Sequence, residues 1–362
     1  MKQRITGWLL IFGLVAACTL SAEVEPRRIE LETVLEARLD TIPVAGVIVL
    51  DEGRWIVAAY LHNTIATWKI GETEPSSRQQ VDDRIVGFDH LHGSNEIFVA
   101  TEGGTVWLWD STLSTERFKH TFPYNARYAA ASPDGQFFSL DGEIGSRTTR
   151  QLLTPAAGHA VASGAAYSAG RFLSSGFIDE SLVLRTPPET ALLRIMSPDK
   201  VRTSDLSPSG EDVVAATEDG RLLLWRIAAT TKPSEVAADT IQPIAKVRIG
   251  QTTGFFFSPN GEALLVGTPD NQVRTYSVPM LELKSTLRLE AAVTASDNYS
   301  PTGVALGLET GEVVLYDFER DQMVAKWQAA SSMITAISAD SEHGLIALGT
   351  DEGRVLVYRG KW

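Results

Sequence analysis

Few residues of this chain are of types and spacings that could support catalysis or metal binding. Histidine occurs six times, and Asp89-His90-Leu91-His92 is the one stretch whose spacing resembles a metal site. On an extended strand His90 and His92 would point to the same side, but a zinc ion needs three or four converging ligands. No third ligand is evident nearby in the sequence. We therefore expect this stretch to be a solvated turn, and we predict no metal and no cofactor.

Covalent and nucleotide chemistry have no support in the sequence. The single cysteine, Cys18, lies near the N-terminus, and the chain contains no nucleophile elbow, phosphate-binding loop or dinucleotide fingerprint. Ser-Pro-x-Gly recurs, but this combination is typical of a tight turn rather than of a nucleophile. We therefore expect a protein that is not an enzyme.

Acidic tight turns are the one charged pattern that rises above the background. Turn chemistry alone favours Asp, Asn and Gly, whereas Glu is not a strong turn former. Two explanations therefore stay open, namely turn preference alone and an acidic ring that meets a basic partner. The acidic residues in or beside these turns are Glu102, Asp141, Glu143, Asp179, Glu180, Glu218, Asp219, Asp270, Glu309, Asp351 and Glu352.

The acidic turns belong to a hairpin that recurs along the chain. Its clearest copy is Asp205–Ile227, where a Ser-Pro-Ser-Gly turn, an apolar run, a Glu-Asp-Gly turn and a second apolar run follow one another. Two short apolar runs joined by Asp-Gly predict a β-hairpin. Eight copies follow one another at spacings of 38 to 51 residues. The last residues of their second turns are Asn63, Gly104, Gly142, Glu180, Gly220, Asn271, Gly311 and Gly353.

The residue five positions after each of these anchors is usually aromatic. Trp or Tyr stands there in six of the eight copies, and Arg147 and Arg185 replace it in the third and fourth. A period near 40 with short strands predicts a β-propeller. We predict an all-β, eight-bladed propeller, with seven blades as the alternative. The arginines indicate either local degeneration of the repeat or a functional seam between the third and fourth blades.

The units resemble WD40 repeats. The Ser-Pro-Asp-Gly turn at 132–135, the Asp-Gly turns and the Trp109-Asp110 pair match that family's unit, while its Gly-His pair survives only as Gly158-His159. The resemblance covers about residues 29–362 and implies one domain whose strands run a, b, c, d from the channel outward. It also implies that Ile29–Leu39 forms an outer strand beside Arg354–Arg359, which closes the ring and removes open sheet edges. The resemblance is nearly silent on activity.

The N-terminus has the features of a bacterial export signal. Lys2 and Arg4 precede an apolar run that is too short for a comfortable membrane span of about 20 residues. Residues 1–17 are predicted as the signal peptide, and residues 15–18 resemble a lipobox that leads to lipidation of Cys18, followed by a tether to residue 28. Cleavage after Ala22 and an uncleaved anchor are the alternatives. Because Asp does not follow the cysteine, the resemblance favours the periplasmic side of the outer membrane, with a soluble periplasmic protein as the alternative.

Charge narrows the choice of partner. The formal net charge of −13 disfavours nucleic acid, because an acidic surface repels phosphate. We expect a monomeric propeller that serves as a protein-interaction scaffold in the cell envelope. The alternative is an enzyme or small-ligand binder at the central channel, as in propeller lactonases and quinoproteins. The inner strands are mostly apolar or hydroxylic, which favours the scaffold.

The expected binding surface is the propeller face that carries the d–a and b–c loops. An acidic rim around aromatic and cationic groups suits a basic, polar partner, and Tyr and Arg are enriched among binding hot spots. The opposite face carries the Ser-Pro-x-Gly turns and an insertion, Ala228–Pro243. The residues predicted to bind a partner are Tyr124, Arg127, His159, Lys200, Arg202, Glu218, Asp219, Asp351 and Glu352.

Overall fold

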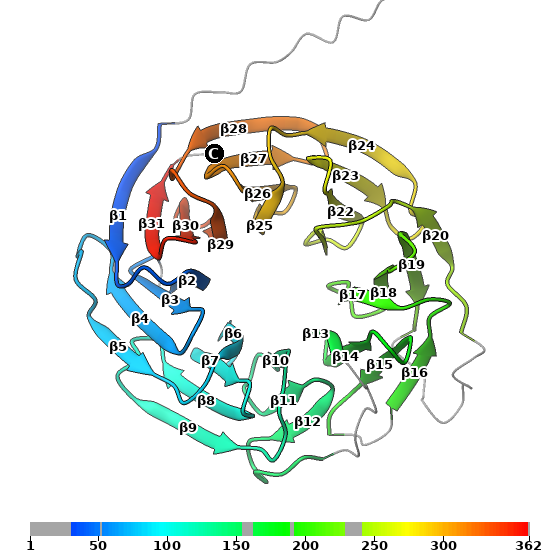
Figure 1. Cartoon of the computed structure of the whole chain (residues 1–362), viewed down its shortest axis with the longest axis horizontal. Coiled ribbons are helices and arrows are strands. Elements are labelled where there is room, and N and C mark those ends of the chain that lie inside the picture. The colour runs from blue at the N-terminus through cyan, green and yellow to red at the C-terminus, as the bar shows by residue number, and fades with distance from the viewer. Residues whose placement is uncertain (1–29, 51–52, 154–161, 189–191, 229–240, 361–362) are drawn as a thin grey trace, which may run out of the picture.

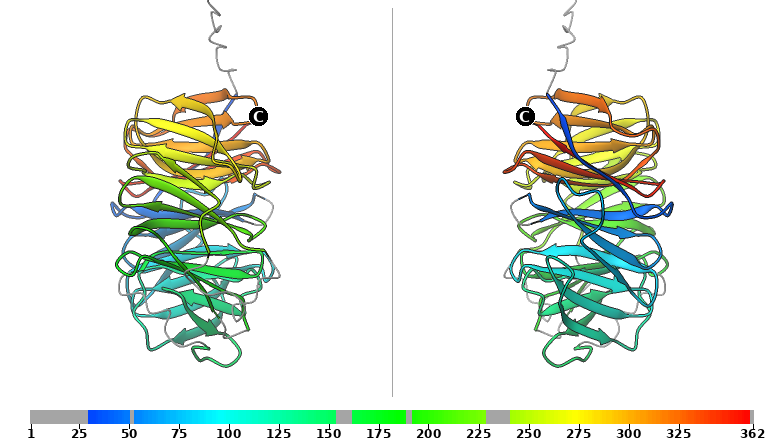
Figure 2. Two further views of the ribbon diagram at one scale, coloured as in Figure 1. Left: turned by 90° about the vertical axis from the view of Figure 1, so that its right-hand side faces the viewer. Right: turned by 90° about the vertical axis from the view of Figure 1, so that its left-hand side faces the viewer.

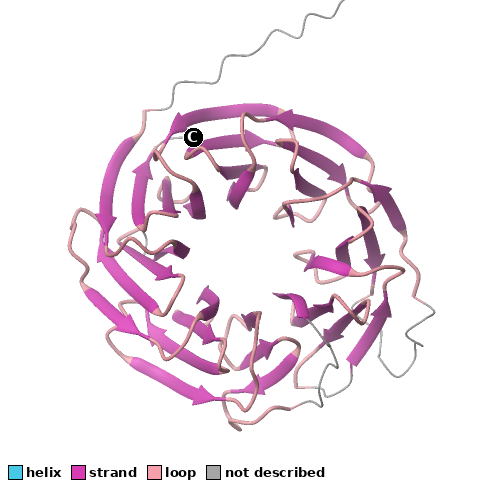
Figure 3. Cartoon of the chain, in the orientation of Figure 1, coloured by secondary structure: helices cyan, strands magenta, loops and turns pink. Residues whose placement is uncertain are grey.

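The computed structural model describes residues 30–50, 53–153, 162–188, 192–228 and 241–360. These residues form strands and turns, without a helix (Figure 3). None of the described segments is therefore a helix that could span a bilayer. The signal peptide, Cys18, the tether, His159 and most of the Ala228–Pro243 insertion lie outside the described residues.

The strands form eight antiparallel sheets that surround a central channel as the blades of a propeller (Figure 1). The predicted eight blades are thus confirmed. From the channel outward, blade 1 contains β2 (Val44–Leu50), β3 (Trp55–Tyr60), β4 (Thr64–Lys69) and β5 (Ser77–Gln80). Blade 2 contains β6 (Ile85–Leu91), β7 (Glu96–Thr101), β8 (Thr105–Asp110) and β9 (Glu116–Thr121). Blade 3 contains β10 (Ala129–Ala131), β11 (Phe137–Leu140) and β12 (Glu143–Ser146).

The remaining blades repeat the four-stranded order. Blade 4 contains β13 (Ala162–Ser168), β14 (Arg171–Gly176), β15 (Ser181–Arg185) and β16 (Leu192–Met196). Blade 5 contains β17 (Val201–Leu206), β18 (Asp212–Thr217), β19 (Arg221–Arg226) and β20 (Ala245–Arg248). Blade 6 contains β21 (Gly254–Phe257), β22 (Ala263–Thr268), β23 (Gln272–Ser277) and β24 (Leu283–Arg288). Blade 7 contains β25 (Val293–Ser300), β26 (Gly303–Leu308), β27 (Glu312–Asp317) and β28 (Gln322–Gln328).

Blade 8 joins the two ends of the described chain. It contains β29 (Ile334–Asp340), β30 (Leu345–Thr350) and β31 (Arg354–Arg359), with β1 (Glu32–Arg38) as its outer strand. β1 runs antiparallel to β31, from Glu32 opposite Arg359 to Arg38 opposite Arg354. The predicted closure by an N-terminal outer strand is therefore confirmed. The side views show the blades as a flat ring with loops on its two faces (Figure 2).

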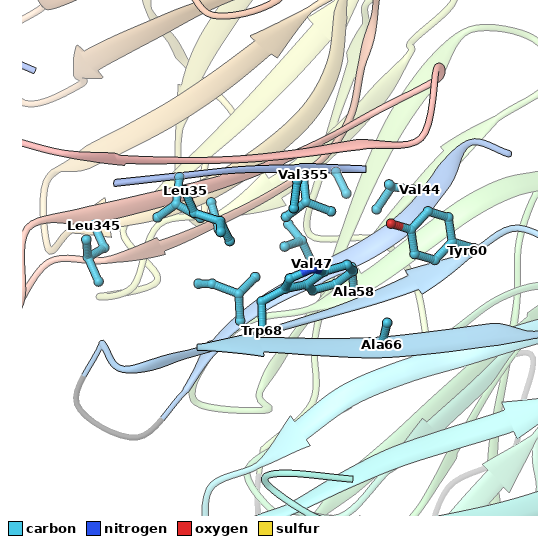
Figure 4. Packing of buried hydrophobic residues seen from close by; sticks show 14 residues of the cluster. Leu35, Val44, Val47, Ala58, Tyr60, Ala66, Trp68, Leu345 and Val355 are labelled. Carbon is cyan, nitrogen blue, oxygen red and sulfur yellow. The ribbon is translucent and has the colours of Figure 1, made fainter. Parts of the chain in front are cut away.

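The core lies in the seams between blades. Strands such as β7 and β26 are buried on both faces, which explains why their sequences are apolar without alternation. Trp68 fills the seam between blades 8 and 1 and is fully buried together with Tyr60, Val355 and Leu35 (Figure 4). Burying a tryptophan removes roughly 150–250 Å² from water, which contributes at most about 4–6 kcal/mol.

Glycine is required at the anchor of the b–c turn by both conformation and space. Gly353 has φ +78°, and a Cβ atom there would lie 2.2 Å from the carbonyl oxygen of Asp40 in the neighbouring d–a loop. Gly104 is placed in the same way, 2.1 Å from the Tyr124 carbonyl oxygen. These anchors therefore let the loops of adjacent blades pack closely on one face of the ring.

Arginines replace the aromatic residue in blades 3 and 4 and have a structural role. Arg147 makes two hydrogen-bonded contacts of 2.9 and 3.1 Å to Glu96 of blade 2, whose side chain is only 3% exposed. Arg185 is 2% exposed, and burial lowers the pKa of its guanidinium, opposed by the carboxylate of Glu143 in blade 3. Arg171 donates to the carbonyl oxygen of Gly210 in blade 5 at 2.9 Å. Buried polar contacts thus support seams where the aromatic residue is missing.

Candidate partner-binding face

Backbone hydrogen bonds fix the d–a and b–c loops on the same face of the ring. In blade 2, Glu102 N donates to Arg84 O at 2.8 Å, and in blade 5, Glu218 N donates to Lys200 O at 2.9 Å. Asp351 N donates to Met333 O at 3.1 Å in blade 8. We call this surface the acidic face. It consists of the described b–c turns 61–63, 102–104, 141–142, 177–180, 218–220, 269–271, 309–311 and 351–353, and of the described d–a loops 39–43, 81–84, 122–128, 197–200, 249–253, 289–292 and 329–333.

The acidic face carries a large excess of carboxylates. Its described loops contain fifteen Asp and Glu residues against three Lys and Arg residues. Two of the predicted acids do not contribute to this charged surface. Glu143 is the first residue of β12 and is 2% exposed, and Asp141 is 7% exposed and accepts hydrogen bonds from the backbone of Arg127 and Tyr128. The predicted annulus is therefore interrupted at blade 3.

Lys200, Arg202 and Glu218, three of the residues predicted to bind a partner, lie together and form ion pairs with one another. Glu218 lies 3.3 Å from Lys200 Nζ and 3.2 Å from Arg202 Nη2. Both cationic groups also lie over the ring of Phe177, at 5.3 and 6.0 Å from its centroid. Phe177 was missed by the sequence analysis, although it directly precedes the acidic turn of blade 4. The negative charge of Glu218 is therefore compensated within the protein.

Asp219 is likewise engaged within its own turn. Its carboxylate lies 2.6 Å from Arg221 Nε and accepts a hydrogen bond from Thr217 Oγ1 at 2.6 Å. Burial acts to raise the pKa of Asp219, but the Thr217 hydrogen bond and the Arg221 charge outweigh it and hold the pKa below its ordinary value. Asp219 therefore stays ionised and paired.

Of Tyr124 and Arg127, only Arg127 lines a cleft of about 680 Å³ between blades 1, 2 and 3. Arg127, Tyr128, Arg84 and Glu102 line the cleft with apolar residues that include Phe88. Arg127 is exposed and makes no ion pair with any described residue. Tyr128, 41% exposed, is an addition that the sequence analysis missed, although it ends the same loop. Tyr124 is partly buried, and burial and the nearby Asp141 raise its pKa.

Asp351 and Glu352 occupy the b–c turn of blade 8, far around the ring from the Glu218 cluster in blade 5 (Figure 1). Neither carboxylate forms an ion pair with a described residue, and Glu352 is exposed. The described residues of the predicted site therefore form three separate groups on one face rather than a single patch. His159, the ninth predicted residue, lies outside the described residues.

The prediction for the histidine stretch was wrong in its placement. Asp89, His90 and Leu91 belong to the inner strand β6, and only His92 begins the turn. Together with β2, β25 and β29, this strand lines a cavity of about 910 Å³ in the central channel. The two imidazole rings lie 4.4 Å apart, edge to face, and His90 Nε2 lies 3.0 Å from Asn95 Oδ1. Within the described part of the chain, no three His, Cys, Asp or Glu side chains converge as metal ligands.

Three aspartates on the channel strands were not anticipated. Asp89, Asp205 and Asp297 each lie opposite the b-strand residue six positions before the anchor of their blade. Each side chain keeps some solvent exposure but is largely surrounded by protein atoms, and this burial raises the pKa of Asp89 and Asp297 and that of Asp205 to about 6. Alignment of the inner strands on the anchors would have revealed the shared position.

Comparison with known proteins supports the fold and not a family. No protein-family model matches the chain, and no curated protein is similar to it in sequence. Among solved structures, the computationally designed protein Ika8 superposes with a TM-score of 0.75 at 16% identity, over 91% of this chain and 99% of Ika8. The β-propeller domain of Cps50 (Swd1) from Myceliophteria thermophila superposes with a TM-score of 0.59 at 15% identity, over 91% of this chain and 99% of that domain. The fold is that of an eight-bladed β-propeller.

Proposed function

We propose that this protein is a non-catalytic interaction scaffold of the bacterial cell envelope. The observation that supports the proposal is the acidic face, where fifteen acidic residues and three basic ones lie in loops beside a 680 Å³ cleft with exposed Arg127 and Tyr128. Rigid blades hold these loops in place, so a partner meets a largely preformed surface. The propeller acts as a monomer, without a cofactor, and binds proteins rather than nucleic acid.

The proposal includes lipidation of Cys18 and residence on the periplasmic side of the outer membrane. β1 begins opposite Arg359, at the end of β31 that is remote from the acidic b–c turn of blade 8. A tether of residues 18–28 reaches on the order of 30 Å when fully extended. A lipid anchor attached through the start of β1 would hold the face that carries the a–b turns near the membrane. The acidic face would then point towards the periplasm.

The experiment has two parts. Wild type and Cys18→Ser are compared by membrane fractionation and by incorporation of a labelled fatty acid, and we expect lipid and membrane association only in the wild type. The tagged wild-type protein is then cross-linked in cells, with cross-linkers placed at Tyr128 and at Thr302 on the opposite face. Specific protein adducts at Tyr128 and none at Thr302 are expected. Absence of adducts at both positions contradicts a scaffold role.

The channel cavity favours a second candidate, a binder of small ligands. Asp89 and Asp297 lie near enough for the charge of one to raise the pKa of the other, and both line the 910 Å³ cavity. The double variant Asp89→Asn/Asp297→Asn distinguishes the two functions. A scaffold that uses its loops retains its adducts at Tyr128 in this variant, whereas a function centred in the channel loses its ligand.

A further inference from the structure

The acidic face is divided into a neutralised part and an uncompensated part. In blades 4 to 6 the acids of the b–c turns other than Glu180 have cationic neighbours, Asp179 with Arg194, Glu218 with Lys200 and Arg202, Asp219 with Arg221, and Asp270 with Arg274. In the loop that enters blade 7, Glu290 lies 2.8 Å from Lys326. The negative charge of this part is therefore largely cancelled inside the protein.

The other part runs from the b–c turn of blade 7 through blades 8 and 1 to that of blade 2. We call it the acidic sector and define it as the loops 309–311, 329–333, 351–353, 39–43, 61–63, 81–84 and 102–104. Its acids are Asp40, Asp82, Asp83, Glu102, Glu309, Asp351 and Glu352, and its one basic residue is Arg84. Arg84 pairs with Glu102 at 3.1 Å, and the other six acids make no ion pair with any described residue. Arg38 lies nearby and donates to the backbone carbonyl of Asp40 at 3.3 Å.

We propose that the acidic sector is the docking site for a basic, Lys- and Arg-rich segment of a partner protein, and that the neutralised blades 4 to 6 contribute little to its binding. The inference rests on the proposed scaffold function and specifies both the partner's chemistry and its place on the face. Charge complementarity is the argument, because six of the seven acids of the sector make no ion pair with any described residue, while most acids in the b–c turns of blades 4 to 6 are paired.

The distribution of the carboxylates favours an extended polypeptide over a compact ion. Glu309, Glu352, Asp40 and Asp83 are all exposed and lie in four of the sector's seven loops, in this order around the ring. Among the described residues no three acids converge as they would around a metal ion. An extended segment advances about 3.3 Å per residue, so a segment of several basic residues can meet successive loops.

Two further features occur in the same four blades. The inner strands of these blades, β2, β6, β25 and β29, line the channel cavity, whose wall includes Asp89 and Asp297 and no Lys or Arg. Asp340 and Glu342 also line this cavity, but they lie at the a–b turn of blade 8, on the opposite face. Leu61, in the b–c turn of blade 1, is 43% exposed and offers apolar surface within the sector, on which the aliphatic part of a lysine or arginine side chain can pack.

The test uses a fluorescently labelled decalysine peptide as the probe and the propeller domain within the full secreted chain. The sector variant is Asp40→Asn/Asp83→Asn/Glu309→Gln/Glu352→Gln, whose amides retain the backbone hydrogen bonds that Asp40 and Asp83 accept from Thr41 and Arg84. The control variant removes the same number of charges from the paired part, as Glu218→Gln/Asp219→Asn/Asp270→Asn/Glu290→Gln. Binding is measured by fluorescence anisotropy at two salt concentrations, and folding by circular dichroism.

Each exposed charge contact contributes about a factor of two, so the sector variant should bind decalysine roughly 15-fold more weakly, with a smaller salt dependence. The control variant should change binding by less than about threefold. Equal losses in both variants mean that net charge alone attracts the peptide, which overturns the proposed sector. Failure of the sector proposal can be told apart from failure of the scaffold function by cross-linking the sector variant at Tyr128 in cells. Adducts that persist in this variant refute the acidic sector as the docking site, but they still support a scaffold function.

Discussion

The ion pair between Arg147 and Glu96 allows the seam between blades 2 and 3 to be tested directly. Replacement of Arg147 by Ala removes both contacts to Glu96 and the cation–π contact to Phe118, whose ring centroid lies 5.9 Å from the guanidinium carbon. Glu96 remains as a carboxylate whose side chain is 3% exposed. The substitution therefore leaves a buried charge without its partner.

The expected cost follows from this burial. Breaking a fully buried ion pair by removing one partner costs about 3–5 kcal/mol. The side chain of Arg147 is 24% exposed, so water can partly solvate the site and we expect about 2–4 kcal/mol. For a propeller of this length the melting temperature should fall by roughly 4 °C.

A double-mutant cycle isolates the pair from the loss of packing. Wild type, Arg147→Met, Glu96→Gln and the double variant are unfolded in urea and followed by both tryptophan fluorescence and far-UV circular dichroism, since coincident transitions justify a two-state treatment. The double variant should be less destabilised than the sum of the single variants by at least about 1.5 kcal/mol, because neither partner is then left buried and charged. Single effects that add to within about 0.5 kcal/mol would refute the argument.

Three further outcomes follow from the structure. Burial raises the pKa of Asp205 from 3.8 to about 6, so the native state prefers the protonated form, and the stability that this group contributes is full below pH 4 and declines as the pH rises to 6. Asp205→Asn should therefore raise the free energy of unfolding by roughly 2 kcal/mol at pH 8 and leave it unchanged at pH 4, measured by urea titration. An equal gain at both pH values would contradict this assignment. Gly353→Ala should lower the melting temperature more than Gly170→Ala. Both glycines have a positive φ, but only a methyl group at position 353 would meet a carbonyl oxygen. Equal decreases in melting temperature would show that backbone strain alone matters. Leu35→Ala in the closing strand should cost about 2–4 kcal/mol in chemical denaturation, and a cost below about 1 kcal/mol would mean that the closure contributes little.

The fold could be predicted from the sequence because the residues that each turn and each seam require recur along the chain. Gly or Asn stands at seven of the eight anchors, and Trp or Tyr stands five residues later in six of the eight units. They reflect local requirements, a positive φ at most of the anchors and a large side chain for the seam. Such local requirements recur at a fixed period, so the number of blades and the closing strand could be counted directly. Units 3 and 4 matched the repeat least well, and among the described residues blade 3 has three strands, with Leu152 bridging to Gly145.

The candidate site was only partly predictable. The sequence showed which turns are acidic and which face they share, but not which carboxylates are already paired. Glu218 and Glu352 look alike in the sequence, yet Glu218 has two cationic neighbours and Glu352 has no ion-pair partner among the described residues. Those neighbours come from a loop and a strand some sixteen residues away, so only the tertiary contacts reveal the pairing.

Arg147 and the aspartates of the channel show the same limit. In the sequence Arg147 reads as a lost aromatic residue, because its partner Glu96 is 51 positions away in another blade. Asp89, Asp205 and Asp297 are separated by more than 90 residues from one to the next, and the closed ring gives them the same place on the channel wall. Local chain geometry thus determined the repeat, whereas the charge that remains on the surface depends on distances across seams, which only the closed propeller fixes.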